Sequence, residues 1–96
     1  MYEMKKIETY DSAWDAIFDN PLEAANMRAK AELMRQIVFF IKKQEWTQSN
    51  VATRCGVTQP RINDLLRGRI SNFSLDALVN IATSLRLRIH IDVEAA

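Results

Sequence analysis

The polar residues that could do chemistry are concentrated in one short segment of this chain. Gln59 and Asn63 are four residues apart, so on a helix they lie on one face. Their side-chain amides can pair with adenine, and the guanidinium groups of Arg61 and Arg67 can bind guanine or a phosphate. These residue types at this spacing indicate contact with base edges in the major groove of a duplex.

Residues 47–68 have the pattern of two short helices joined by a tight turn, which is the layout of a helix-turn-helix motif. Ala52 is small where the second helix comes closest, and Gly56 stands where a helix must end in the left-handed conformation. Thr47 and Thr58 each precede a helix and can cap its free amides. The apolar positions that two steeply crossing helices would bury are Val51, Cys55, Val57, Ile62 and Leu65.

The second helix of the motif, about residues 59–67, is expected to be the recognition helix. Gln48, at the start of the first helix, is placed for a phosphate. Asp64 repels phosphate and can only accept a hydrogen bond, so it is either a specificity element or an ion-pair partner of Arg61 or Arg67. The expected DNA-contacting residues are Gln48, Thr58, Gln59, Pro60, Arg61, Asn63, Asp64, Arg67, Arg69 and Asn72.

The charges of the chain are segregated although the net charge is only +1. Residues 1–27 carry six acids and two lysines, whereas residues 28–73 carry nine bases and three acids. Residues 74–96 carry two bases and three acids. A basic middle between acidic ends favours a nucleic-acid partner, because neutralised phosphates supply most non-specific affinity.

Length and composition are those of one ordinary globular domain spanning residues 1–96, with the motif at 47–68. No apolar run approaches the roughly 20 residues of a membrane span, and a single cysteine suits the cytoplasm. Cys55 is expected to be a small core residue. His90 has no cysteine nearby, and the regular spacing of Asp11, Asp15 and Asp19 is interpreted as a solvated acidic face. We expect no metal, no cofactor and no enzymatic activity.

The rest of the chain is expected to be helical up to its C-terminal end. Residues 4–10 form a weak extended segment, and helices are predicted over 12–18, 21–44 and from the cap Ser74 to Leu85. Residues 69–73 are expected to be a loop. The apolar stripe of the long helix is expected to bury Leu22, Ala25, Met27, Ala31, Leu33, Met34, Ile37, Val38, Phe40 and Ile41. That of the last helix is expected to bury Leu75, Leu78, Val79, Ile81, Ala82 and Leu85.

The period of the apolar residues changes to two after residue 86, which predicts a half-buried strand. A lone strand is not stable, so this one would pair either with residues 4–10 or across the two-fold axis of a dimer. The apolar residues that dimerisation would bury are Leu87, Ile89, Ile91 and Val93.

The segment from Gln48 to Arg69, followed by residues 73–78, resembles the Xre/Cro-like helix-turn-helix family, and more narrowly the HigA-type antitoxins. The resemblance covers residues 20–86. It implies an all-α, five-helix domain similar to lambda repressor, acting as a homodimer that represses its own operon at a palindromic operator, with a RelE/HigB-like toxin as partner. Gln48 matches the phosphate-contacting glutamine of the family and Gln59 its base-reading glutamine. Pro60 and Asp64 stand where phage repressors carry glutamines, so no operator sequence is carried over.

Three functions remain open at this point. The first is a dimeric repressor that doubles as an antitoxin, its recognition helices about 34 Å apart. The second is a free-standing phage- or plasmid-type regulator, which the absence of a RelE-like reading frame beside the gene would indicate. The third is a protein-interaction module without DNA binding, against which Arg61, Asn63 and Arg67 argue.

Overall fold

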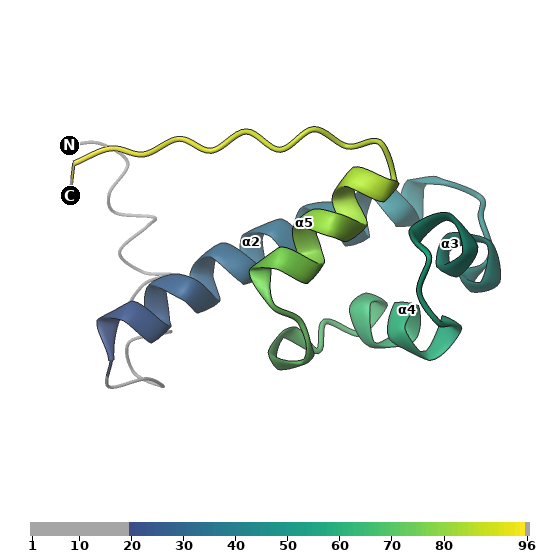
Figure 1. The fold of residues 1–96 in the computed structure, drawn as a ribbon, viewed down its shortest axis with the longest axis horizontal. Helices are drawn as coiled ribbons and strands as arrows, with labels where there is room; N and C mark the ends of the chain where they lie inside the picture. Colours follow the sequence, from purple (N-terminus) through teal and green to yellow (C-terminus); the bar gives the residue numbers. More distant parts are fainter. Residues whose placement is uncertain (1–19, 96) are drawn as a thin grey trace.

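The computed structural model describes residues 20–95, in which five helical elements joined by short connections end at residue 84. The predicted helix over residues 12–18 and the predicted extended segment over residues 4–10 lie outside the described residues. The remaining predicted helices are confirmed to within about one residue at each end. The elements are α2 (Pro21–Lys43), α3 (Gln48–Cys55), α4 (Gln59–Leu66), the short 3₁₀ helix η1 (Ile70–Asn72) and α5 (Leu75–Ser84) (Figure 1).

Each described α-helix begins at the polar cap that the sequence predicts. The Asn20 side chain accepts a hydrogen bond from the Leu22 amide, and Pro21 follows at the first helical position. Thr47 and Thr58 accept from the amides three residues on, which begin α3 and α4. Ser74 does the same for α5. These side chains satisfy amides that have no partner within the helix.

The three hydroxyl caps share a second feature, which is a pair of apolar residues at fixed positions before and after the cap. An apolar residue precedes the cap, and another follows it four residues later, the arrangement of a hydrophobic staple. The following residue is buried in each case, and the preceding one is buried or half-buried. The three staples are Trp46 and Val51, Val57 and Ile62, and Phe73 and Leu78. Each helix start is therefore tied both to its cap and to the core.

One core joins all the helices. The middle and end of α2 contribute Met34, Ile37 and Ile41, and the shorter elements pack on them. Phe73, which is 2% exposed, is the largest fully buried side chain, although the sequence places it in a loop. The other buried members are Val51, Ala52, Ile62, Leu65, Leu78, Ile81, Ala82 and Leu85.

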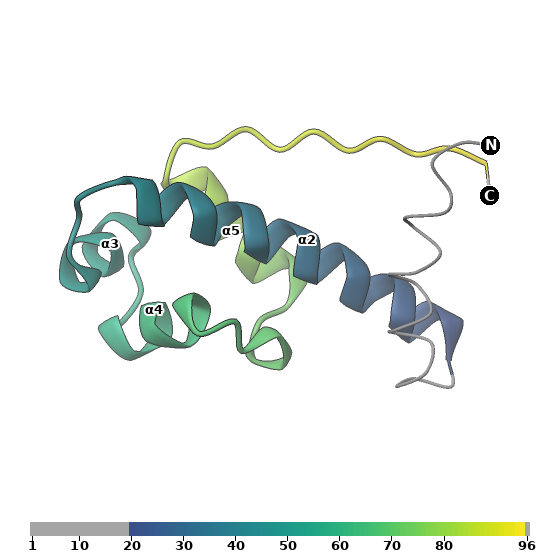
Figure 2. The same cartoon turned by 180° about the vertical axis from the view of Figure 1, so that it is seen from behind.

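The apolar stripe predicted for α2 is wrong at its start. Leu22 is 74% exposed and Ala25 is exposed on the first turns of this 23-residue helix, which extend past α5 (Figures 1 and 2), whereas Ala24 between them is fully buried. The buried side of the helix start is therefore not the one that the predicted stripe indicates. Val79 of α5, also expected to be buried, is 38% exposed.

The chain leaves α5 through a Schellman-type turn. The amides of Arg86 and Leu87 donate to the carbonyls of Thr83 and Ala82, both at 2.9 Å. Arg86 occupies the left-handed position of this turn, with φ at 66°, where glycine is the usual residue.

Residues 87–95 (here called the tail) are extended but form no strand, so the predicted strand is not present among the described residues. The tail runs back in the direction opposite to α2 (Figures 1 and 2). Leu87 and Ile89 are half-buried and pack against the core, whereas Ile91 and Val93 are 80% and 89% exposed. A strand requires a hydrogen-bonded neighbour, and the described residues of one copy provide none.

None of the helices in the described part of the chain is long and apolar enough to cross a membrane.

Phe73→Ala is expected to lower the free energy of unfolding by about 3–5 kcal/mol, the usual cost of removing a buried phenylalanine. Urea denaturation measures this loss. The matched control is Phe39→Ala, whose side chain is 62% exposed on α2 and whose removal should cost within about 0.5 kcal/mol. Equal losses in the two variants would contradict the position of Phe73 in the core.

Candidate nucleic-acid interface

The turn between α3 and α4 fixes how the two motif helices cross. Gly56 ends α3 with φ at 68°, a conformation that other residues adopt only at a cost. The Val57 amide then donates to the Ala52 carbonyl at 3.0 Å, and Thr58 begins α4. Val51 and Ala52 of α3 are buried, as are Ile62 and Leu65 of α4. The predicted helix-turn-helix geometry is confirmed.

The outer side of α4 presents the polar residues that the sequence singled out. Gln59, Pro60 and Arg67 are exposed, and Asn63 is half-buried. Because Gln59 and Asn63 are one turn apart, their amides lie on the same side of the helix. Pro60 lies in the first turn, where its missing amide costs no hydrogen bond. This side of α4 can therefore offer hydrogen bonds to a molecule outside the protein.

Arg61 lies on α4 but its guanidinium binds within the protein. Its Nη1 donates to the Asn72 carbonyl at 2.8 Å, and its guanidinium carbon lies 4.1 Å from the centre of the Phe73 ring. The side chain thereby fastens η1 to the start of α4. The sequence grouped Arg61 with the outward residues, and a DNA contact by this residue stays a prediction.

Asp64 has partners that the sequence did not identify. One interpretation of the sequence is an ion pair of Asp64 with Arg61 or Arg67. In the structure, Asp64 Oδ1 pairs with Arg69 Nη1 at 3.4 Å. Its Oδ2 accepts from the side-chain amide of Asn72, also at 3.4 Å. Arg69 directly precedes η1 and Asn72 ends it. The path of the chain from α4 into η1 therefore brings both side chains to Asp64. The negative charge of Asp64 is thus paired, and it lies beside Arg69 and Asn72, two residues that we expect to contact the DNA backbone.

The start and end of α3 supply further polar groups. Gln48 is half-buried at the first position of α3. At the other end, Arg54 Nε donates to Asn50 Oδ1 at 2.6 Å, and its guanidinium carbon lies 3.8 Å from the centre of the Trp46 ring. The Trp46 ring also packs edge-on against Phe40 of α2. Sequence reasoning counted the charge of Arg54 without finding this stack, although an arginine eight residues after a tryptophan across a helix start is a possible signal.

The thiol of Cys55, at the end of α3, is a further candidate for chemistry. Cys55 is half-buried, and burial raises the pKa of its thiol, which lowers its reactivity. Among residues 20–95, no cluster of three His, Cys, Asp or Glu side chains could hold a metal ion. Asp11, Asp15 and Asp19 lie outside the described residues.

The capped helices, the left-handed glycine and the exposed polar side of α4 define a helix-turn-helix domain of the Xre-like type. A family described as a helix-turn-helix domain matches residues 17–94, and the chain belongs to that family. A search of the curated proteins finds no match. Family membership assigns the chain to the class of DNA-binding regulators.

Arg61→Ala is expected to lower the free energy of unfolding by about 1–2 kcal/mol, since it removes a charged hydrogen bond and a cation–π contact. Arg67→Ala is the matched control: this arginine is exposed on the same helix, and its loss should change stability by no more than about 0.5 kcal/mol. Thermal or urea denaturation of both variants checks the difference. If both variants were as stable as the parent chain, Arg61 would not fasten η1 to α4.

Proposed function

We propose that this chain is a sequence-specific transcriptional repressor that binds duplex DNA as a homodimer, with the outer side of α4 in the major groove. The observation that carries the proposal is the polar row on a rigidly held helix. Gln59 is exposed and Asn63 half-buried on one side of α4, while the opposite side is fixed in the core by Ile62 and Leu65. An α-helix of this kind fits the major groove, where each base pair presents a distinct set of donors and acceptors.

The residues around α4 then divide into two roles. Gln59 and Asn63 read base edges, with Thr58 and Pro60 at the same end of the helix. Gln48, Arg67, Arg69 and Asn72 bind the phosphates on either side, which fixes the register of the helix without reading sequence.

Asp64 is compatible with a DNA-facing surface because its charge is compensated. Its carboxylate is engaged by Arg69 and Asn72, which reduces its repulsion of phosphate. Each carboxylate oxygen has a second lone pair, which can still accept from a cytosine amino group. The same network orients Arg69 and Asn72, so Asp64 acts on DNA both directly and through them.

The finer proposal is that this repressor is the antitoxin of a type II toxin–antitoxin pair and neutralises a RelE/HigB-like toxin. Its support is the resemblance of residues 58–68 to the HigA-type antitoxins. A RelE-like reading frame beside the gene, whose toxicity is relieved when this chain is co-expressed, is the expected finding. A gene without such a neighbour indicates a free-standing regulator instead. Neither version assigns catalysis to the chain.

Gln59→Ala is expected to weaken binding to the preferred duplex by about 1–3 kcal/mol and to blur its sequence preference. The preferred duplex is obtained by enrichment from a random pool, and fluorescence anisotropy measures the affinity. Gln36→Ala, which changes an exposed glutamine on α2, is the matched control and should bind like the parent chain. Unchanged affinity and preference in Gln59→Ala would remove α4 as the reading element.

Arg67→Ala is expected to weaken binding to all duplexes about equally. If each copy in a dimer loses one phosphate contact, the slope of log affinity against log salt should fall by about 2. Titrations at several salt concentrations measure the slope, with Lys30→Ala in the N-terminal half of α2 as the control of equal charge. A protein-interaction module without DNA binding would give no salt-dependent affinity for any duplex, with or without Arg67.

A further inference from the structure

The tail and the residue before it carry an ordered series of charges. Arg86 and Arg88 come first, His90 is in the middle, and Asp92 and Glu94 follow. All five are exposed. The residues between them are apolar, so one side of the extended chain is charged and the other is apolar. The charge therefore changes sign along the tail, with His90 at the midpoint.

The tail has the backbone of a strand without the partner of one. Its last backbone hydrogen bond among the described residues is the one from the Leu87 amide to Ala82. Beyond it, the amides and carbonyls of residues 88–95 present an unpaired edge, and an unpaired edge is a template for a second strand. Ile91 and Val93, at 80% and 89% exposure, are the most exposed large apolar residues of the described chain.

We infer that the tail pairs with the tail of a second copy of this chain, antiparallel and centred on His90. This register places Arg88 opposite Asp92 of the partner subunit, a pair that occurs twice, and brings Glu94 of the partner subunit toward the turn at Arg86. On the other side of the ribbon, Ile89 meets the partner's Ile91, and Leu87 meets the partner's Val93. The inference deepens the homodimer of the proposed function and rests on it.

Charge complementarity selects this arrangement over its competitors. A parallel pair in register would set Arg88 against its own copy and Asp92 against its own copy, and like charges directly opposite are destabilising. A shift by one residue would turn the apolar side of one tail toward the charged side of the other. The antiparallel register centred on His90 is the one that pairs Arg88 with an acid and all four apolar residues with one another.

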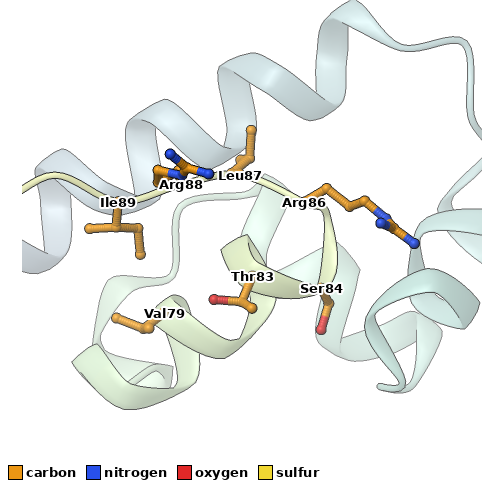
Figure 3. A pocket seen from close by; sticks show the side chains of 7 residues that line it. All are labelled: Val79, Thr83, Ser84, Arg86, Leu87, Arg88 and Ile89. Atoms are coloured by element: carbon orange, nitrogen blue, oxygen red, sulfur yellow. The ribbon is translucent and has the colours of Figure 1, made fainter.

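The groove between α5 and the tail accepts the apolar side of the partner. It has a volume of about 670 Å³, and Val79, Leu87 and Ile89 contribute apolar surface to it, as Figure 3 shows. The partner's Ile91 and Val93 would lie next to Ile89 and Leu87, at this groove. Their burial there would also cover Val79, the one large apolar residue of α5 that is exposed in the single copy.

The direction of the symmetry axis agrees with DNA binding. The two-fold axis of an antiparallel pair can run perpendicular to the ribbon, from its charged side through its apolar side. The apolar side faces the body of the protein, since Leu87 and Ile89 pack against the core. In both views the tail lies on one side of α2 and α5, and α4 lies on the other (Figures 1 and 2). An axis in that direction leaves the two copies of α4 facing the same way.

Arg86 lies at the start of the proposed two-stranded ribbon. Arg86 adopts the left-handed conformation that favours glycine, so its side chain is present despite a backbone cost. Arg86 is one of the residues that line the groove beside α5, and its side chain extends away from Val79 and Ile89 (Figure 3).

Cysteine cross-linking tests the register in the full chain without DNA. In a Cys55→Ala background, His90→Cys places two thiols opposite each other, where Cα atoms are about 4.5–5.5 Å apart and a disulfide can form. Asp92→Cys is the control, because its two copies would be offset by about 13 Å along the strands. Oxidised glutathione should link the first variant into a covalent dimer and leave the second unlinked. No link at position 90, or equal linking at both positions, overturns the register.

Charge reversal tests the ion pairs by sedimentation analysis. Arg88→Asp should weaken the dimer about tenfold or more, since it converts two attractive pairs into two repulsive ones. The double change Arg88→Asp with Asp92→Arg should restore the affinity of the parent chain. A parent chain that is monomeric, or a double variant no better than the single one, overturns the inference. These outcomes are separate from DNA binding: a dimer linked at position 90 that binds no duplex would refute the proposed function alone.

Discussion

The turn at Gly56 to Thr58 is the constraint on which the rest of the structure depends. It joins α3 to α4 within three residues, through a left-handed glycine and a hydroxyl cap. An L-residue at position 56 would strain the turn and change the angle between α3 and α4. Since Ile62 and Leu65 must enter the core on one side of α4, that angle also decides where Gln59 and Asn63 point. The same geometry therefore serves both folding and the proposed binding of DNA.

Three helix starts use one device, a hydroxyl cap between two apolar residues. The device matters here because α3, α4 and α5 have only eight to ten residues each. Isolated helices of that length are marginal in water, so they depend on caps and on burial. Arg61 adds a fourth tie, from α4 to η1 and the Phe73 ring. The result is that the position of α4 is fixed before any ligand binds, which reduces the cost of ordering it on binding.

Helix boundaries were predictable from the sequence because caps, Gly56 and Pro21 act locally. Features that depend on distant contacts were not predictable. Phe73 was assigned to a loop, although its place before the cap Ser74, with Leu78 four residues after that cap, is a staple signal. Leu22 is exposed while Ala24 in the same turn is buried, a difference that depends on tertiary contacts and not on the apolar stripe of α2 alone. The ion pair of Asp64 with Arg69 depends on the path of η1, and the strand in the tail requires a neighbour that one copy lacks.

The proposed function requires that the outer side of α4 bind base edges in duplex DNA. The most direct measurement is an NMR titration of the ¹⁵N-labelled chain with the enriched duplex, which follows the side-chain amide signals of Gln59 and Asn63. We expect large shifts of both signals at stoichiometric duplex, while the side-chain amide of Asn80 on α5 stays in place. Shifts confined to α2 or α5, with Gln59 and Asn63 unchanged, would contradict it.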